Sequence, residues 1–230
     1  MHSEAHQTSD GVGAGQEIAS ALCAAPRIKR LGLVGFAPTY AAMRQFTTSR
    51  QQHTPDEIWI LQHLPVYTAG LACRPQHLPR ATGIPLERID RGGQITYHGP
   101  GQVVIYTLLD LARRKIKIRA LVGLIEQAVI NVLAEHGLTA ERASGAPGVY
   151  VNGAKIAALG LRVKSKGCYH GLALNVDMDL SPFHAIDPCG YPGLAVTQTR
   201  DLGVDASADV LGDALAAELA NLLAQHELGR

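Results

Sequence analysis

Two side chains in the C-terminal half of the chain are of the types that acyl transfer through a thioester requires. Lys155 follows an Asn152-Gly153 turn, and Cys189 lies in the proline- and glycine-rich segment DPCGYPG at residues 187–193. The thiolate is the reactive form of cysteine, and a nearby ammonium group lowers the pKa of the thiol. We therefore expect Cys189 to be the nucleophile and Lys155 to be the residue that tunes it.

A second candidate site is the glycine-rich segment RGGQITYHGPG at residues 91–101. Its four glycines in eleven residues let the backbone approach a ligand closely. Arg91 can pair with a carboxylate or phosphate, and His98 can exchange protons. A bulged hairpin with one surface arginine is the structural alternative, but polar residues between two apolar strands favour a ligand site. The segment is not a phosphate-binding P-loop, because GxxxxGK[ST] occurs nowhere in the chain.

Two apolar segments near Lys155 are expected to form the wall of a substrate pocket. Residues 156–161 (IAALGL) contain small side chains that leave room beside the lysine, and residues 170–175 (HGLALN) combine one histidine with small and apolar residues. An apolar wall of this kind suits a fatty acyl chain. Lys155 could instead be an exposed charge at a strand edge, and His170 could be a core histidine bonded to a backbone carbonyl. An inward-pointing lysine would be partly desolvated, with a lowered pKa.

The composition is that of an ordinary globular protein and argues against several classes of partner. The chain has 230 residues, 47% of them hydrophobic and 18% charged, which predicts one domain with a substantial core. The formal net charge of +1 argues against a nucleic-acid partner. No apolar stretch is long enough to span a membrane, and the acidic sequence before Ile18 lacks the Lys and Arg of an export signal. We expect a cytoplasmic protein with no membrane partner.

The cysteines predict neither a disulfide framework nor a metal site. The four of them are scattered and form no CxxC pair: Cys23, Cys73, Cys168 and Cys189. Cys168 and His170 would share one face of a strand and could join Cys189 or His184 around a metal. Cys168 is more simply explained as a small strand residue.

Hydrophobic patterning predicts an α+β fold with a mixed β-sheet flanked by helices. One domain is expected over residues 28–230, after a disordered N-terminal extension at residues 1–27 that is rich in Ser, Gly, Ala, Gln and His. The expected strands are 28–36, 57–64, 86–90 and 102–109, followed by a three-stranded meander over 149–175 with turns at Asn152-Gly153 and Lys166-Gly167.

Three helices are expected around this sheet. The first begins near Pro38 and ends near Gln51, and the second covers residues 118–136 and stops at Gly137. The third begins at Ser207. The buried stripes of the second and third helices should consist of Leu121, Ile125, Val129, Val132 and Leu133, and of Leu211, Leu215, Leu219, Leu222 and Leu223.

Four segments in this order resemble the octanoyltransferases, also called lipoyl(octanoyl) transferases. They are RGGQITYHGPGQ at 91–102, GVYVNGAKIAALGLRV at 148–163, HGLALNVDMDL at 170–180 and DPCGYPG at 187–193. The resemblance covers roughly residues 29–200 and implies the mixed-sheet fold of biotin and lipoate protein ligases. One departure is Gln62, where the family commonly has Glu.

The resemblance also implies an activity, its partners and its residues. The family transfers octanoyl from acyl-carrier protein to a lysine on lipoyl domains of 2-oxoacid dehydrogenase complexes and on the glycine cleavage H protein. Cys189 corresponds to the acyl-thioester nucleophile and Lys155 to the lysine that tunes it, while His170 is a candidate accessory residue. The residues that correspond to the acyl-substrate pocket are Arg91, Gly92, Gly93, Gln94, Ile95, Thr96, Tyr97, His98, Ala158, Leu159, Gly160, Gly171, Leu172 and Ala173.

This chemistry requires no ATP and no cofactor, because exchange between thioesters is nearly balanced in energy. Other functions stay open at this point: an ATP-dependent lipoate or biotin-type ligase, a non-catalytic acyl-carrier-binding protein, and a cysteine hydrolase. A basic run could dock an acidic carrier or could be a solvated loop. It consists of Arg113, Arg114, Lys115, Lys117 and Arg119.

Overall fold

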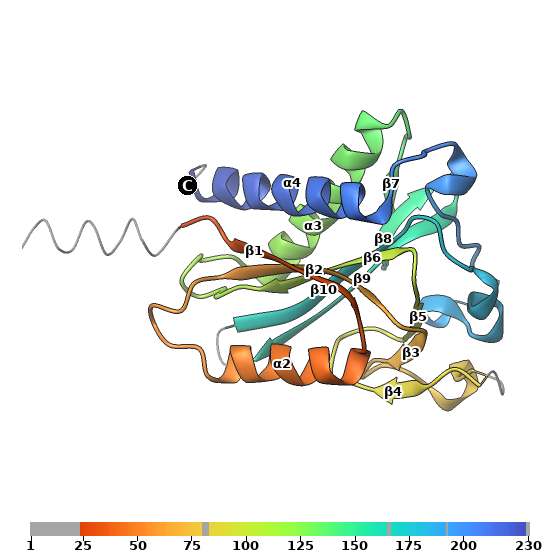
Figure 1. Cartoon of the computed structure of the whole chain (residues 1–230), viewed down its shortest axis with the longest axis horizontal. Helices are drawn as coiled ribbons and strands as arrows, with labels where there is room; N and C mark the ends of the chain where they lie inside the picture. The colour runs from red at the N-terminus through yellow and green to blue at the C-terminus, as the bar shows by residue number, and fades with distance from the viewer. Residues whose placement is uncertain (1–23, 80–82, 165–166, 192, 229–230) are drawn as a thin grey trace, which may run out of the picture.

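The computed structural model describes residues 24–79, 83–164, 167–191 and 193–228, apart from the side chain of Cys189. Most of the predicted N-terminal extension, Cys23 and Lys166 therefore lie outside the described residues. Seven strands form a mixed sheet in the order β1-β2-β6-β10-β9-β8-β7 (Figure 1). Their bounds are β1 Arg27–Val34, β2 Glu57–His63, β6 Gln102–Leu108, β10 Gly167–Asn175, β9 Ala154–Lys164, β8 Ala146–Val151 and β7 Glu141–Ala143.

The pairing within this sheet confirms the predicted α+β class. β1 runs parallel to β2, whereas the other neighbouring pairs are antiparallel. The predicted meander is the hairpin series β8-β9-β10. Its first turn has positive φ at both Asn152 (50°) and Gly153 (79°), which is the backbone that a type I′ turn requires and that Asn-Gly favours.

A second, three-stranded sheet corrects the sequence prediction for the region around the glycine-rich segment. It has the order β4-β3-β5, with bounds β3 Val66–Ala69, β4 Leu86–Arg88 and β5 Ile95–His98. The strands expected at 86–90 and 102–109 therefore belong to different sheets, and β3 and β5 were missed. These short strands pair with one another across the connection from residue 70 to 94, so local patterning carries little sign of them.

Three helices cover the large sheet, as predicted. α3 Ile118–Glu135 and α4 Ala208–Leu228 pack on one face, and α2 Phe36–Thr48 lies on the other face together with the small sheet (Figure 1). All five residues of the predicted α3 stripe are buried. On α4 the stripe is confirmed except at Leu222, which is half-buried. Among the described residues, no helix is both long and apolar enough to cross a membrane.

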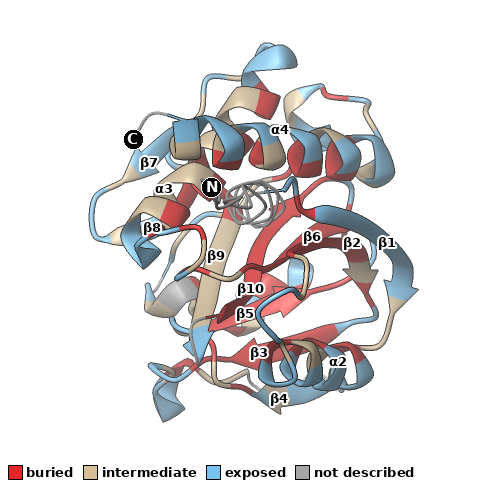
Figure 2. Cartoon of the chain, turned by 90° about the vertical axis from the view of Figure 1, so that its left-hand side faces the viewer, coloured by how far each residue is buried: buried red, intermediate tan, exposed pale blue. Residues whose placement is uncertain are grey.

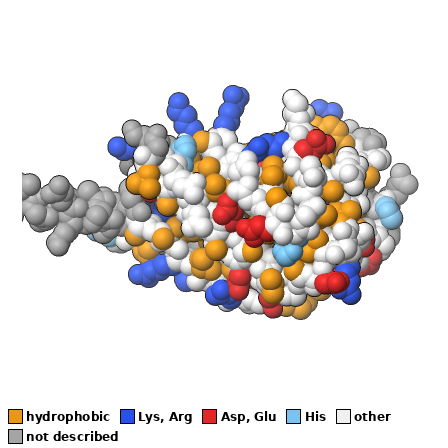
Figure 3. Space-filling view, turned by 90° about the horizontal axis from the view of Figure 1, so that it is seen from above, with side chains coloured by type: hydrophobic (Ala, Val, Ile, Leu, Met, Phe, Trp, Pro, Cys, Tyr) orange, Lys and Arg blue, Asp and Glu red, His pale blue; other side chains and the backbone are white. Residues whose placement is uncertain are grey.

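The strands of the large sheet differ in how far their residues are buried. The central strands β2, β6 and β10 are almost wholly buried, whereas β9 is only half-buried from Ala158 to Arg162 (Figure 2). This half-buried stretch lines an open cavity. The face over α4 carries Lys, Arg, Asp and Glu side chains that are interspersed among hydrophobic ones (Figure 3).

The buried carboxylate of Asp56 gathers part of the basic run into the protein. Its Oδ1 accepts hydrogen bonds from Arg50 (2.7 Å), Arg113 (2.6 Å) and the main-chain N–H of Asp110 (2.9 Å), and its Oδ2 accepts one from Arg114. Arg114 also pairs with Glu227 of α4 at 2.5 Å. Arg113 and Arg114 therefore have structural contacts, and the exposed cations of the run are Lys115, Lys117 and Arg119.

We predict that Asp56→Ala lowers the free energy of unfolding by about 3–5 kcal/mol, because it leaves buried guanidinium groups without their carboxylate. Urea denaturation measures this loss. Asp213→Ala, which removes an exposed ion pair with Arg30, serves as the control and should leave the free energy of unfolding nearly unchanged. A loss at position 56 no larger than in this control would contradict a structural role for the cluster.

Candidate active site

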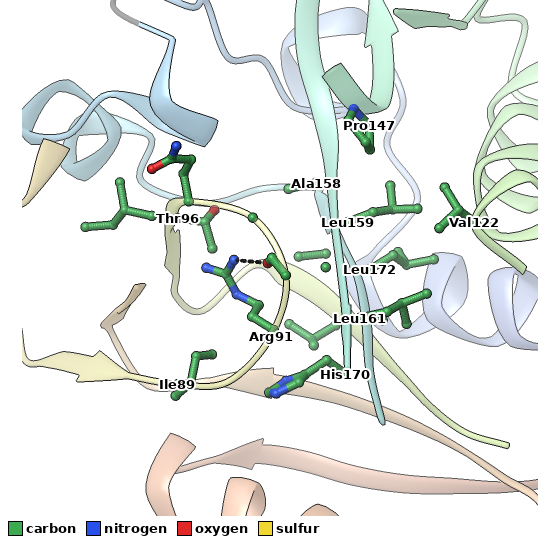
Figure 4. A pocket seen from close by; sticks show the side chains of 18 of the residues that line it. Ile89, Arg91, Thr96, Val122, Pro147, Ala158, Leu159, Leu161, His170 and Leu172 are labelled. Atoms are coloured by element: carbon green, nitrogen blue, oxygen red, sulfur yellow. Dashed lines mark hydrogen bonds between the residues drawn. The ribbon is translucent and has the colours of Figure 1, made fainter. Parts of the chain in front are cut away.

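A cavity of about 390 Å³ lies between the large sheet, the glycine-rich segment and the start of α3 (Figure 4). Its walls come from β5, β6, β9 and β10, from the loop after β4, and from Ile118 and Val122 of α3. Gly145, the first two residues of β8, Phe36 of α2 and Tyr191 also line it. Most of these side chains are apolar, so the cavity suits an aliphatic chain.

The structure brings nearly all of the predicted pocket residues to this cavity. Arg91 to Thr96, His98, Ala158 to Gly160 and Gly171 to Ala173 line it. Tyr97 does not. Its ring packs 5.5 Å from that of Tyr67 and 5.6 Å from that of Phe183, in the core of the small sheet.

Lys155 is buried at the start of β9, with 3% of its surface exposed. Its Nζ donates to the carbonyl oxygen of Pro147 at 3.0 Å and lies 5.1 Å from the ring centroid of Tyr150. Pro147 lines the cavity, so the ammonium group lies beside the cavity wall. Gly148 makes this packing feasible: its φ is +144°, and a Cβ there would lie 2.9 Å from Cε of Lys155.

The segment that carries Cys189 is joined to Lys155 through the main chain. Cys189 lies in the short 3-10 helix η3 Pro188–Gly190, and its side chain is outside the described residues. Farther along, the N–H of Lys155 donates to Ala195 (2.8 Å) and the N–H of Thr197 donates to Lys155 (3.0 Å). The Cys189 segment thus returns to the strand that begins at Lys155.

Arg91 fixes the glycine-rich segment. Its Nη2 donates to the carbonyl oxygen (2.6 Å) and the Oγ1 (2.9 Å) of Thr68 on β3, and its Nη1 donates to the carbonyl oxygen of Gly92 at 2.9 Å (Figure 4). The guanidinium therefore connects the small sheet to the cavity wall. The side-chain oxygen of Gln62 accepts from the N–H of Gly101 at 2.8 Å and so holds the other end of this segment.

Three buried histidines surround the inner part of the site and are held neutral. Burial lowers the pKa of His63 to about 4, of His98 to about 3 and of His170 to about 3. His63 must carry its proton on Nδ1, which faces the carbonyl oxygen of Val34 at 3.1 Å, so its Nε2 accepts from the hydroxyl of Tyr106 at 2.7 Å. His98 Nδ1 lies 2.7 Å from Oε1 of Gln102.

His170 is the least satisfied of the three. Its φ is +65°, its side chain stacks on Tyr40 of α2, and it is 2% exposed. Its Nε2 lies 3.8 Å from Asp90 and has no hydrogen-bond partner among the described residues, and the same holds for the buried Oε1 of Gln94. Both residues line the cavity, whose other lining is mostly apolar.

Sequence reasoning missed the polar cluster behind His170. Asp90 accepts hydrogen bonds from the hydroxyls of Tyr40 (2.7 Å) and Tyr169 (2.5 Å) and lies 3.7 Å from Arg162. Although burial opposes ionisation, these partners hold the pKa of Asp90 below its usual value. No local motif connects these residues, which come from α2, β9, β10 and the end of β4.

The structure disfavours the metal alternative. Cys168 packs in the core under α3 and α4, and its thiol donates to the carbonyl oxygen of Thr107 at 3.3 Å. His170 lies on the opposite face, against α2, because its left-handed backbone interrupts the alternation of the strand. Within the described residues, no group of three or more His, Cys, Asp and Glu side chains could hold a metal ion.

Comparisons with known proteins decide the family. Residues 37–220 match the model of the lipoyl protein ligase A/B catalytic domain. The chain is also 62% identical over 200 residues to a curated octanoyltransferase from Dechloromonas aromatica (strain RCB), covering 87% of this chain and 98% of that protein. The chain belongs to the octanoyltransferase family. It is therefore an acyltransferase, and the alternative of a non-catalytic carrier-binding protein is wrong.

Solved structures confirm the predicted fold at low sequence identity. A lipoate-protein ligase A bound with ATP has a TM-score of 0.73 at 18% identity and covers 87% of this chain and 86% of its own. A biotin protein ligase from Aquifex aeolicus has a TM-score of 0.54 at 10% identity, covering 89% and 72%. The octanoyltransferase family thus shares the mixed-sheet architecture of these ligases.

The neutral histidines predict acid sensitivity. Each has a folded-state pKa below the value of about 6.5 expected when unfolded, so the unfolded state binds more protons as the pH falls. Above about pH 6.5 the histidines do not lower the free energy of unfolding. As the pH falls toward 4, each buried histidine lowers it by up to ~1.4 kcal/mol per pH unit. In urea titrations from pH 7 to 4, we expect His63→Gln to have a shallower slope than the wild type. The exposed-residue control His136→Gln should keep the wild-type slope, and an equal slope in both variants would contradict the prediction.

Proposed function

We propose that this chain transfers an octanoyl group from acyl-carrier protein to a lysine side chain of lipoyl domains, through a thioester on Cys189. The acceptors would be the lipoyl domains of 2-oxoacid dehydrogenase complexes and the glycine cleavage H protein, in the cytoplasm. The observation that carries the proposal is the burial of Lys155 beside an apolar cavity, with its main chain bonded to the segment that follows Cys189. Membership of the octanoyltransferase family supports the choice of acyl group.

In the first half-reaction the Cys189 thiol loses its proton, and the thiolate attacks the carbonyl carbon of the octanoyl thioester. The tetrahedral intermediate collapses by breaking the bond to the carrier sulfur, which leaves as a thiol after taking up a proton. The products are an octanoyl-Cys189 thioester and the free carrier. In this proposal Lys155 lowers the pKa of the thiol and moves the proton.

In the second half-reaction the ε-amine of a lipoyl-domain lysine attacks the acyl-enzyme. The bond to Sγ of Cys189 breaks, an amide forms, and the amine gives up a proton that the thiolate and Lys155 can share. Because an amide is more stable than a thioester, this step drives the cycle without ATP or a cofactor. The two macromolecules would use the enzyme in turn, which predicts ping-pong kinetics.

The cavity provides a place for the acyl chain during both steps. Leu159, Leu172 and Val122 form an apolar surface, and the chain would displace water from it. Ile118, which is 39% exposed, also belongs to the lining and is flanked by the exposed Lys117 and Arg119. An acidic carrier could dock on these cations while its arm enters the cavity beside Ile118.

An ATP-dependent ligase is the main alternative, because a ligase bound with ATP shares the fold. That chemistry activates a free acid as an adenylate and needs no cysteine. A cysteine hydrolase would instead release free octanoate. One assay that varies the acyl donor and identifies the product therefore distinguishes the transferase, the ligase and the hydrolase.

The first test is the intact mass of the enzyme after mixing with octanoyl-acyl-carrier protein alone. We expect a single octanoyl adduct on the wild type. Cys189→Ser should form no thioester adduct, and Cys189→Ala should lose transfer while its fold stays intact. The matched control is Cys73→Ala, which removes a different, partly buried cysteine and should still form the adduct. An unmodified wild type that becomes active only with ATP and free octanoate would favour the ligase.

The second test concerns Lys155. Replacement by Met keeps most of its volume but removes the ammonium, so the midpoint pH for alkylation of Cys189 by iodoacetamide should rise by roughly 1–3 pH units. Lys164→Met, at the exposed end of the same strand, should leave the midpoint unchanged. If the Lys155 variant titrates like the wild type, Lys155 does not tune the thiol.

A further inference from the structure

We propose that His77 is a positioning residue for the acyl transfer, which holds the Cys189 segment in place through Asp187. This inference rests on the proposed function, since it assumes that Cys189 is the nucleophile. His77 Nδ1 lies 2.7 Å from Oδ2 of Asp187, although the two residues are 110 positions apart in the chain. The His77 side chain is buried at 10% exposure, and that of Asp187 is 31% exposed. Neither residue lines the cavity.

Asp187 is well placed to control where Cys189 lies. It directly precedes η3, and its carbonyl oxygen accepts a hydrogen bond from the N–H of Gly190 at 2.8 Å, which closes the turn around Cys189. Any displacement of Asp187 therefore moves the turn that carries the thiol. A carboxylate accepts hydrogen bonds only, so Nδ1 of His77 must donate, which it can do in both the neutral and the protonated ring.

His77 is itself fixed to the wall of the acyl cavity. It ends the short 3-10 helix η1 Pro75–His77, which follows the loop after β3. In that loop the N–H of Leu71 donates to the carbonyl oxygen of Arg91 (3.0 Å), and the N–H of Ala72 donates to that of Gly93 (3.1 Å). Arg91 and Gly93 both line the cavity. The hydrogen bonds from Gly93 to the loop after β3, and from His77 to Asp187, thus connect the wall of the acyl cavity to the segment that carries the nucleophile.

The segment between residues 187 and 195 is held at two ends. At its C-terminal end, Ala195 bonds to the main chain of Lys155, and in its middle the hydroxyl of Tyr191 donates to Gly145 at 3.3 Å. Without His77, the part that precedes Cys189 would keep the packing of Ile186 in the core of the small sheet, but Asp187 would lose its side-chain hydrogen bond. A displacement of about 1 Å between a nucleophile and its target can cost on the order of 100-fold in rate. The His77–Asp187 bond is therefore expected to act on rate rather than on the binding of either protein substrate.

The test compares His77→Ala, His77→Asn and the control His184→Ala, an exposed histidine of the neighbouring helix η2 Ser181–Ala185. The readouts are the rate of octanoyl adduct formation, kcat and KM for a lipoyl domain, and the pH profile of Cys189 alkylation. We expect His77→Ala to lower the adduct rate and kcat by roughly 10–100-fold with KM changed less than twofold. The alkylation midpoint should rise, because the thiol moves away from Lys155. In His77→Asn the amide N–H can take the place of Nδ1–H, so most of the rate should return.

Each other outcome has a defined meaning. An adduct rate and alkylation midpoint in His77→Ala that match His184→Ala would overturn the positioning role, as would a folded His77→Asn that is as slow as the alanine variant. If His77→Ala fails to fold, Asp187→Ala removes the same bond from its more exposed side and must show the same loss of rate. A wild type that forms no adduct would overturn the proposed function and this inference with it, whereas an active wild type with an unaffected His77→Ala overturns the inference alone.

Discussion

The burial of the Lys155 ammonium is the constraint on which the rest of the site depends. Removing a charged amine from water costs several kcal/mol unless polar groups surround it. The chain provides the carbonyl oxygen of Pro147 and the ring of Tyr150, and it places glycine at 148, where a side chain would collide with the lysine. The same β8-β9 hairpin, held by the Asn152-Gly153 turn, fixes the lysine at the first residues of β9. A fold that served only for stability would place an apolar side chain at this position, so the arrangement favours a chemical role.

The inner part of the site combines an apolar cavity with polar groups that carry little charge. Its three histidines are neutral at physiological pH because burial outweighs their hydrogen bonds, and Arg91 directs its donors to the main chain and to Thr68. An octanoyl chain therefore meets little competition from tightly hydrated groups. The aromatic stacking among Phe36, Tyr40 and His170 also fixes the shape of the wall without adding charge. Rigid walls would define the position of a reacting carbonyl better than a flexible lining.

The sequence predicted those parts of the fold whose signals are local. The helical stripes, the Asn-Gly turn and the start of the third helix at Ser207 depend on residues within one or two turns of one another, and all were confirmed except Leu222, which is half-buried. The small sheet was missed because β3 and β5 are four residues each and are stabilised by pairing across a long connection. For the same reason, no sequence pattern could place Arg113 and Arg114 on Asp56, or Tyr40 and Tyr169 on Asp90. Most predicted pocket residues do line the cavity, since they form continuous strands and turns, and Tyr97 departs because its ring packs on Tyr67 and Phe183 in the core of the small sheet.

The shared architecture of ligases and transferases can be understood from what each chemistry must hold. The proposed transfer needs an apolar cavity for the acyl chain and a cation near the reacting carbonyl carbon, and the β8-β9 hairpin holds a buried lysine beside such a cavity. A ligase that uses ATP must also bind a nucleotide, whereas the transferase proposed here would hold one thiol beside the carbonyl while two proteins bind in turn. The second requirement falls on a single short segment, residues 187–195, which is bonded to the Lys155 strand at one end and to His77 at the other. Because that segment lies outside the sheet, changing it can alter the reaction without disturbing the core that positions the lysine and the cavity.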